Sequence, residues 1–364
     1  MRQARHHRNQ VGQDRGDRKV QGRCRCAGYR RHPSDRHLSS VADPRTVLVL
    51  TGPEDPTADA VVSEITRRGV RAARHDLGDF PVRARLSAIH DSNGWSGRII
   101  GTDTTTNLDE VVAVYYRRPR RFTFPPGMSD ADRAYAEAEA RLGMGGVLAA
   151  LGCRWVNHPH HIARAEWKPL QLEIARHAGL ATPLTLIGND PSDVAEFAEL
   201  ADGPVVCKTL SSMVLAENGQ HKITYTTPID PHSIDHTAFA ATAHLLQAWI
   251  PKAREARVTV VGGRVLAVAI EADSARARVD WRADYDALRY LPITVPAEVT
   301  VGMFAYLRAF ELNYGGFDFV ITPDEEWIML ECNPSAQWLW LHYIAGLPIP
   351  AALADLLTLA DDSA

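Results

Sequence analysis

Two apolar strands near the C-terminus, residues 316–322 and 327–333, constrain the fold most because both carry polar side chains inside buried runs. Side chains alternate between the faces of a strand, so Glu331 and Asn333 share one face. Asp318 points away from its phenylalanine neighbours in the first strand. The segment therefore predicts a hairpin with two acids and one amide in its interior.

The pairing of the two acids follows from the turn. If the turn is centred between Asp324 and Glu325, Asp318 faces Glu331 across the hairpin. Like charges directly opposite each other are destabilising unless a positive charge lies between them. Two carboxylates and the Asn333 amide oxygen are hard ligands that suit Mg²⁺, which proteins hold through few side chains plus substrate phosphates. An exposed polar face would explain one acid, but not a pair in strands that look buried on both faces.

Strands and helices alternate along the chain from residue 46, which is typical of an α/β fold. We expect three units: an open α/β sheet in residues 45–150, a small α+β unit in 151–250 and an antiparallel unit in 251–364. The predicted helices are 56–68, 129–151, 162–177, 192–200 and 302–312, with two short ones at the C-terminus. The predicted strands are 46–52, one ending near 76–77, two flanking Asn93-Gly94, 111–116, 155–159, 183–187 and 205–210. Hairpins are predicted at 256–271, with its turn at Gly262-Gly263, and at 316–333.

The first 44 residues differ from the rest. The first forty contain ten Arg and one Lys against three Asp and almost no aliphatic residues, although the chain of 364 residues has a net charge of −4. Such a segment cannot form a core, so we expect a disordered basic extension. It lacks the interleaved aromatic residues of a nucleic-acid arm, and no nucleic-acid partner is expected. A start of the native chain near Val41 is the alternative.

Several classes of protein are excluded by composition. No run approaches the roughly 18 apolar residues of a membrane span, and the N-terminus lacks a secretory signal, so a cytoplasmic protein without a membrane partner is expected. Five cysteines show no paired spacing, which predicts neither disulfides nor zinc. Cys24 and Cys26 fit an unstructured segment better than a metal site.

Three cations accompany the acids along the chain. Lys208 lies in an apolar strand, Lys168 begins a helix, and Arg257 opens a strand beside Glu255. Taken singly, each fits an ordinary role: an ammonium reaching solvent, a solvated helix start and a local ion pair. Beside a magnesium site, the same three cations are what a polyphosphate and a developing acyl phosphate need.

The order of these residues resembles the ATP-grasp superfamily of carboxylate ligases over residues 45–360. The resemblance is carried by Lys168, Lys208, Leu246-Gln247-Ala248-Trp249-Ile250-Pro251, Arg257-Val258-Thr259-Val260, Asp318 and Glu331-Cys332-Asn333-Pro334. It implies ATP between the last two units, with Lys168 and Lys208 on its phosphates and backbone groups of Gln247, Ala248, Trp249 and Ile250 on its adenine. It also implies that Arg257 and Lys208 act on the transferred phosphoryl group and that Asp318, Glu331 and Asn333 bind Mg²⁺.

A closer resemblance is to the graspetide maturases, relatives of the microviridin ligases. Its motifs are Tyr115-Tyr116-Arg117-Arg118-Pro119, Trp155-Val156-Asn157-His158-Pro159, Val279-Asp280-Trp281-Arg282 and Glu331-Cys332-Asn333-Pro334-Ser335-Ala336-Gln337-Trp338. It implies ATP-dependent macrocyclisation of a ribosomal precursor peptide with a leader and a core. Asp or Glu side chains become acyl phosphates, which Ser or Thr hydroxyls or Lys amines then attack. Two departures are the glycine-poor loop 211–219 and Ala336, where glycine is expected.

Substrate contacts are expected at Arg117 and Arg118, since ligands gather at strand ends of open α/β sheets. A solvated strand end is the alternative. For Asp280 and Arg282, a substrate contact and a local ion pair are equally open. His158, His160 and His161 follow a strand end at proline, and no metal is expected there.

Other functions share the nucleotide site. A ligase for free amino acids is one alternative, and a non-catalytic nucleotide-binding regulator is another. A nucleic-acid binder using the basic extension is a third. The ester or amide nature of the rings, their number and the oligomeric state, including a homodimer, do not follow from the chain.

Overall fold

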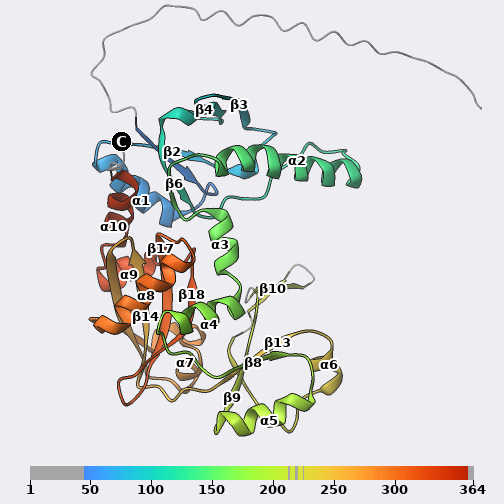
Figure 1. The fold of residues 1–364 in the computed structure, drawn as a ribbon, viewed down its shortest axis with the longest axis vertical. Coiled ribbons are helices and arrows are strands. Elements are labelled where there is room, and N and C mark those ends of the chain that lie inside the picture. Colours follow the sequence, from blue (N-terminus) through green and yellow to red (C-terminus); the bar gives the residue numbers. More distant parts are fainter. Residues whose placement is uncertain (1–44, 212–213, 218–219, 224, 360–364) are drawn as a thin grey trace, which may run out of the picture. The chain divides into compact units, whose positions relative to one another are not determined.

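A computed structural model describes residues 45–359, except 212–213, 218–219 and 224. The predicted basic extension and Cys24 and Cys26 lie outside the described residues. Figure 1 shows the elements coloured along the chain. The described residues all belong to one compact unit. Within the described ranges, no helix has both the length and the apolar character that crossing a membrane requires.

A parallel sheet of four strands opens the fold, in the order β2-β1-β6-β7. Its strands are β1 (Thr46–Leu50), β2 (Arg71–His75), β6 (Val111–Tyr116) and β7 (Arg154–Val156), with helices α1 (Pro56–Arg67) and α2 (Asp130–Ala149). Asp55 caps α1 by accepting the backbone N–H bonds of Thr57 and Ala58. A separate antiparallel sheet holds β3 (Arg85–Asp91), β4 (Gly94–Ile100) and β5 (Thr105–Asn107). Because β7 pairs with β6, the first sheet continues past residue 150.

The middle of the chain forms an antiparallel sheet in the order β12-β9-β13-β8. Its elements are β8 (Thr185–Gly188), α5 (Ser192–Ala201), β9 (Val205–Lys208), β12 (Thr227–Ile229), α6 (His236–Ala240) and β13 (His244–Ala248), beside the pair β10 (Val214–Glu217) and β11 (Gln220–Ile223). The single helix predicted over 162–177 is wrong. It is two helices, α3 (Pro159–Ala165) and α4 (Lys168–His177). Pro169 explains the break because it has no backbone N–H to donate to the Ala165 carbonyl, so it fits only the first turn of a new helix.

The last third is a five-stranded antiparallel sheet in the order β16-β15-β14-β17-β18. Its elements are β14 (Arg254–Val261), β15 (Arg264–Ala272), α7 (Ala275–Val279), β16 (Leu288–Pro292), α8 (Ala297–Ala309), β17 (Tyr314–Ile321), β18 (Trp327–Asn333), α9 (Leu339–Ala345) and α10 (Ile349–Thr358). Both predicted hairpins are confirmed, and Gly262 has a φ of 55° in the first turn. Helix α8 begins five residues before its predicted start, directly after Pro296. Val299, Met303 and Tyr306 of α8 pack in one core with Val258 of β14 and Phe317 of β17.

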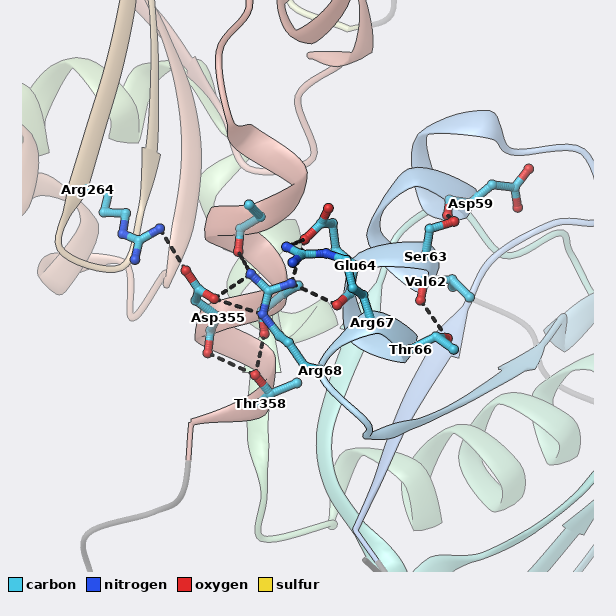
Figure 2. Close-up of polar contacts among 12 residues, drawn as sticks. Asp59, Val62, Ser63, Glu64, Thr66, Arg67, Arg68, Arg264, Asp355 and Thr358 are labelled. Carbon is cyan, nitrogen blue, oxygen red and sulfur yellow. Dashed lines mark hydrogen bonds and ion pairs between the residues drawn. The ribbon is translucent and has the colours of Figure 1, made fainter. Parts of the chain in front are cut away.

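A second core joins the first sheet to the C-terminal helices. Val47 and Val49 of β1 pack in one cluster with Trp338, Leu353 and Leu357. A polar network borders this core (Figure 2). Arg68, which follows α1, donates to Asp355 of α10 at 2.8 Å and to Glu64 at 2.6 Å, and Arg264 lies 2.8 Å from the same Asp355 carboxylate. Asp355 therefore ties α1 to α10 and to the turn of the first hairpin.

Asp355→Asn is expected to lower the free energy of unfolding by about 1 kcal/mol, because two arginines lose one carboxylate at a partly exposed site where solvent screens the charges. Burial acts to raise the pKa of Asp355, but Arg68 and Arg264 outweigh it, so the pKa is lowered. The stabilisation is therefore full above the usual aspartate pKa of about 3.9 and is lost as the pH falls through the lowered value. Denaturant unfolding at pH 7 and pH 3 measures this, with the exposed Asp109→Asn as the control. An equal difference from wild type at both pH values would contradict the ion-pair explanation.

Candidate active site

The two acids of the second hairpin face each other as predicted. Asp318 of β17 pairs with Glu331 of β18, and Gly316 pairs with Asn333. The predicted turn geometry is not what produces this register. Nearer the turn, Phe319 pairs with Met329, so a bulge leaves Leu330 as an extra residue before Glu331. Without the bulge, the register near the turn would place Asp318 opposite Leu330. The extra residue moves the pairing of Asp318 to Glu331.

Both acids already have cationic partners. Arg257 of β14 donates to both carboxylate oxygens of Asp318 at 2.6 Å. Lys168, the first residue of α4, donates to Glu331 at 2.5 Å. The positive charge that the pair requires is thus supplied by side chains, which corrects the argument that these acids need a metal ion to be tolerated. The acids are not sealed off, because Asp318, Glu331, Arg257 and Lys168 all line a cavity of about 880 Å³.

The neighbouring charges and the burial of the site shift the pKa values of Glu331 and Lys208. Burial acts to raise the pKa of Glu331, but Lys168, Lys208 and Arg282 outweigh it, and the pKa lies below its usual range. Burial lowers the pKa of Lys208, with Lys168 and Arg282 acting in the same direction and Glu331 against them. The Lys208 ammonium makes no hydrogen bond or ion pair within the described ranges. Glu331 is therefore an anion surrounded by several cations, and Lys208 has donors left for a ligand.

Two buried amides that the sequence analysis did not assign hold the acid-bearing strand in place. Asn157 donates to the carbonyls of Tyr314 and Pro334 at 2.7 and 2.9 Å, and its oxygen accepts the N–H bonds of Asn313 and Tyr314. Gln171 of α4 donates to the Cys332 carbonyl and accepts from the Cys332 N–H, both at 3.0 Å. Glutamine and asparagine buried beside apolar residues were the available signal, because buried amides require partners.

Asn157→Ala is expected to destabilise the protein by about 2–4 kcal/mol, since it leaves several buried backbone groups without partners. It is also expected to weaken nucleotide binding, because Pro334 directly follows Asn333. Thermal unfolding and nucleotide titration measure the two effects. Asn107→Ala, at an exposed asparagine whose side chain bonds Glu110, is the matched control. Unchanged stability in Asn157→Ala would show that these bonds contribute little.

The segment predicted to hold adenine lies where β13 ends. Gln247, Ala248, Trp249 and Ile250 line a narrower cavity of about 60 Å³, which shares Lys208 with the larger one. The backbone N–H groups of Ala248 and Trp249 donate to the carbonyls of Leu184 and Pro204. The Gln247 side chain donates to the Thr185 hydroxyl at 3.0 Å. These donors are already bonded to other parts of the protein. Adenine is therefore expected to bind the remaining polar groups of the segment.

The two arginines at the end of β6 have different surroundings. Arg117 is only 4% exposed and donates to the carbonyls of Ser335 and Ala336 and to the Gln337 side chain. It supports the loop after Asn333, and its contacts do not point to the predicted substrate clamp. Arg118 is exposed and lines the large cavity, as predicted for a substrate contact.

Asp280 and Arg282 form a local pair. Arg282 donates to both Asp280 oxygens, at 2.8 and 3.0 Å, and Asp280 also accepts the Thr226 N–H. Both sequence alternatives therefore have support, since Arg282 also lines the large cavity. The His158 ring contacts His160 edge-on and His161 at a tilt. No cluster of three or more His, Cys, Asp or Glu suited to a metal occurs among the described residues.

The unexpected Ala336 has a structural explanation. A Cβ placed on Gly316 would lie 2.4 Å from the Ala336 methyl group and 3.4 Å from the Arg257 guanidinium. The methyl of Ala336 therefore occupies space that Gly316 leaves open. Residues 212–213 and 218–219 of the glycine-poor loop lie outside the described residues.

Comparison with known proteins assigns the chain to a family. The family model described as the MvdD pre-ATP grasp domain matches residues 46–163. The macrocyclase MdnC from Microcystis aeruginosa MRC, solved with precursor peptide MdnA, is 30% identical, with a TM-score of 0.74 over 86% of this chain and 99% of that one. The chain belongs to the ATP-grasp ligases of the graspetide type. The ATP-grasp fold predicted from the sequence is thereby confirmed.

Two further solved structures resemble this ATP-grasp ligase. A RiPP-associated ATP-grasp ligase from Chryseobacterium gregarium, in complex with ADP and a leader and core peptide, is 24% identical, with a TM-score of 0.79 over 86% of this chain and 96% of that one. The macrocyclase MdnB from Microcystis aeruginosa MRC is 25% identical, with a TM-score of 0.73 over 87% and 100% of the two chains. No curated protein sequence matches the ligase. The likeness extends over most of this chain and nearly all of the relatives' chains.

Proposed function

We propose that this ligase uses ATP and Mg²⁺ to close rings within a ribosomal precursor peptide. The observation that carries the proposal is the set of cations around two facing acids at one large cavity: Lys168, Lys208, Arg257 and Arg282 with Asp318 and Glu331. Such a cavity suits a polyphosphate and a peptide carboxylate together. The solved relative at 30% identity is a macrocyclase bound with its precursor peptide.

The residues present fit a magnesium ion. Asp318, Glu331 and Asn333 all line the large cavity and offer two carboxylates and an amide, the oxygen donors that Mg²⁺ prefers. Arg257 has a buried Nε without a hydrogen-bond partner, which points to an acceptor that the protein itself does not supply. When bound, Mg²⁺ would supply positive charge that stabilises the negative charge developing on the phosphates.

The protein's own cations have separate tasks in this proposal. Lys208, which has free donors, and Lys168 bind the phosphates, and Lys168 exchanges its bond to Glu331 for one to phosphate. Arg257 faces the transferred phosphoryl group. Backbone groups of residues 247–250 bind adenine, while Arg118 and Arg282 contact the peptide.

The reaction balances in two steps. A peptide carboxylate oxygen attacks the γ-phosphorus and ADP leaves, which gives an acyl phosphate. A Ser or Thr hydroxyl or a Lys amine of the same peptide then attacks the acyl carbon, loses its proton, and phosphate leaves. A carboxylate is a poor electrophile until its oxygen becomes a good leaving group, and the bound peptide keeps both partners close. Each ring therefore removes one water from the peptide.

The test uses a short peptide encoded beside the ligase gene, rich in Thr and acidic residues. With ATP and Mg²⁺ the peptide is expected to lose one water for each ring, with one ADP released for each water lost. ADP release only with free amino acids would instead support a small-molecule ligase, and tight ATP binding without ADP release would support a regulator. Homodimerisation stays a prediction.

A further inference from the structure

The cavity of about 880 Å³, the reaction cavity, adjoins another of about 430 Å³, which we call the second cavity. Its walls come from the loop between β1 and α1 and from the start of α9, and it shares three lining residues with the reaction cavity: Arg118, Gln337 and Trp340. The other lining residues are Thr51, Gly52, Glu54, Asp55, Pro56, Thr57 and Leu339. The acids and cations assigned to the nucleotide line the reaction cavity and not the second cavity. An extended ligand can therefore pass from one cavity into the other across Arg118.

Arg118 differs from its neighbour in having donors left for a ligand. Arg117 is buried against two carbonyls and an amide oxygen. The Arg118 side chain, by contrast, makes no hydrogen bond or ion pair with any described residue, although its own carbonyl accepts the Gly52 N–H at 3.2 Å. That bond fixes the backbone of Arg118 against the β1–α1 loop. The backbone of Arg118 is thus fixed at the passage between the cavities, and its guanidinium keeps its donors for a ligand.

The lining acids do not provide this arginine with a partner. Asp55 accepts bonds from the Thr51 hydroxyl at 2.7 Å and from two N–H groups of α1, and it lies 3.4 Å from Arg117. Glu54 is exposed and makes no ion pair with Arg118. A guanidinium presents its donors in a fork that matches a carboxylate or a phosphate. The residues assigned to the nucleotide phosphates do not line the second cavity, so the chemical class that fits Arg118 there is a carboxylate.

We propose that this second cavity binds an acidic residue of the precursor peptide that does not itself react, with its carboxylate on Arg118. The inference rests on the proposed function and adds a specificity site to it. The reacting carboxylate must reach the phosphates beside Asp318 and Glu331, and these residues do not line the second cavity. An acid that binds Arg118 from within the second cavity is therefore a separate one, which fixes how far along the peptide the reacting residue lies.

The test compares Arg118→Gln with Arg121→Gln, an exposed arginine three residues away that lines neither cavity. In ring closure followed by mass, Arg118→Gln is expected to raise the KM for peptide about tenfold or more, as losing a charged bidentate contact does. The KM for ATP is expected to stay within about twofold in both variants, and Arg118→Lys should recover part of the loss.

Peptide variants test the same contact with unmodified enzyme, so the result does not depend on how Arg118→Gln folds. Each acidic residue of the peptide is replaced in turn by its amide. One replacement is expected to raise the KM as Arg118→Gln does while the number of rings stays complete, and combining it with Arg118→Gln should add little. The proposal is overturned if Arg118→Gln leaves the peptide KM unchanged, if it raises the KM for ATP equally, or if the two changes add fully. A wild-type enzyme that leaves the peptide mass unchanged would instead remove the proposed function.

Discussion

Glu331→Gln is expected to reduce peptide-dependent ADP release by about a thousandfold or more, with the fold intact. The amide keeps the shape of the side chain but removes the charge that the metal and Lys168 both require. Lys168 then lacks its carboxylate partner at 2.5 Å, although it keeps solvent access at the cavity. A coupled assay for ADP with saturating peptide measures the loss, and circular dichroism checks the fold.

Asp324→Asn is the matched control for this prediction. It makes the same kind of change in the same hairpin, at an exposed residue of the turn. Turnover in Asp324→Asn should equal that of wild type. Turnover in Glu331→Gln within about tenfold of wild type would remove Glu331 from the metal site.

Arg257→Met is expected to impair both stability and turnover. Arg257 donates two bonds of 2.6 Å to Asp318, and both residues are more than nine-tenths buried. Removing one partner of a buried ion pair leaves the other charge uncompensated and costs about 3–5 kcal/mol. Loss of the guanidinium that is proposed to face the transferred phosphoryl group should also reduce turnover by about a hundredfold or more. Chemical denaturation and the ADP assay measure the two effects.

A second change tests how much of the stability loss comes from the uncompensated charge of Asp318. Adding Asp318→Asn to Arg257→Met removes the uncompensated charge, so part of the lost stability should return while turnover stays low. Turnover stays low in the double variant also because Asp318 is a proposed magnesium ligand, so recovery of turnover would mean that neither Arg257 nor Asp318 acts in the reaction. No recovery of stability would mean that packing of the arginine, rather than its charge, stabilises this sheet.

The strands of the sheet and the facing of Asp318 and Glu331 were accessible from the sequence because apolar alternation determines which side chains share a face. The roles predicted for Lys168, Lys208 and Arg257 came from the family resemblance. The Asp318–Glu331 pairing was correct, but the bulge at Leu330 that produces it was not predicted. A bulge depends on packing against neighbouring strands, which local periodicity does not record. The division of residues 162–177 into two helices could have been predicted from Pro169 alone.

The different roles of the adjacent arginines Arg117 and Arg118 could not be predicted from the sequence in this way. Arg117 and Arg118 follow the same strand, yet one is buried against the loop after Asn333 and the other lines two cavities. Their difference depends on residues more than two hundred positions away in the chain. The bonds of Asn157 and Gln171 to the acid-bearing strand are equally long-range. The sequence indicates that buried amides need partners, but it does not name them.

The central claim, that Asp318, Glu331 and Asn333 hold the magnesium of the nucleotide, is tested most directly by a crystal structure with Mg²⁺ and ADP. The prediction is an ion bonded to oxygens of these residues and of the diphosphate at about 2.0–2.1 Å, with Lys168 moved from Glu331 to phosphate. An ion held elsewhere, with the Lys168–Glu331 and Arg257–Asp318 bonds unchanged, would contradict the claim.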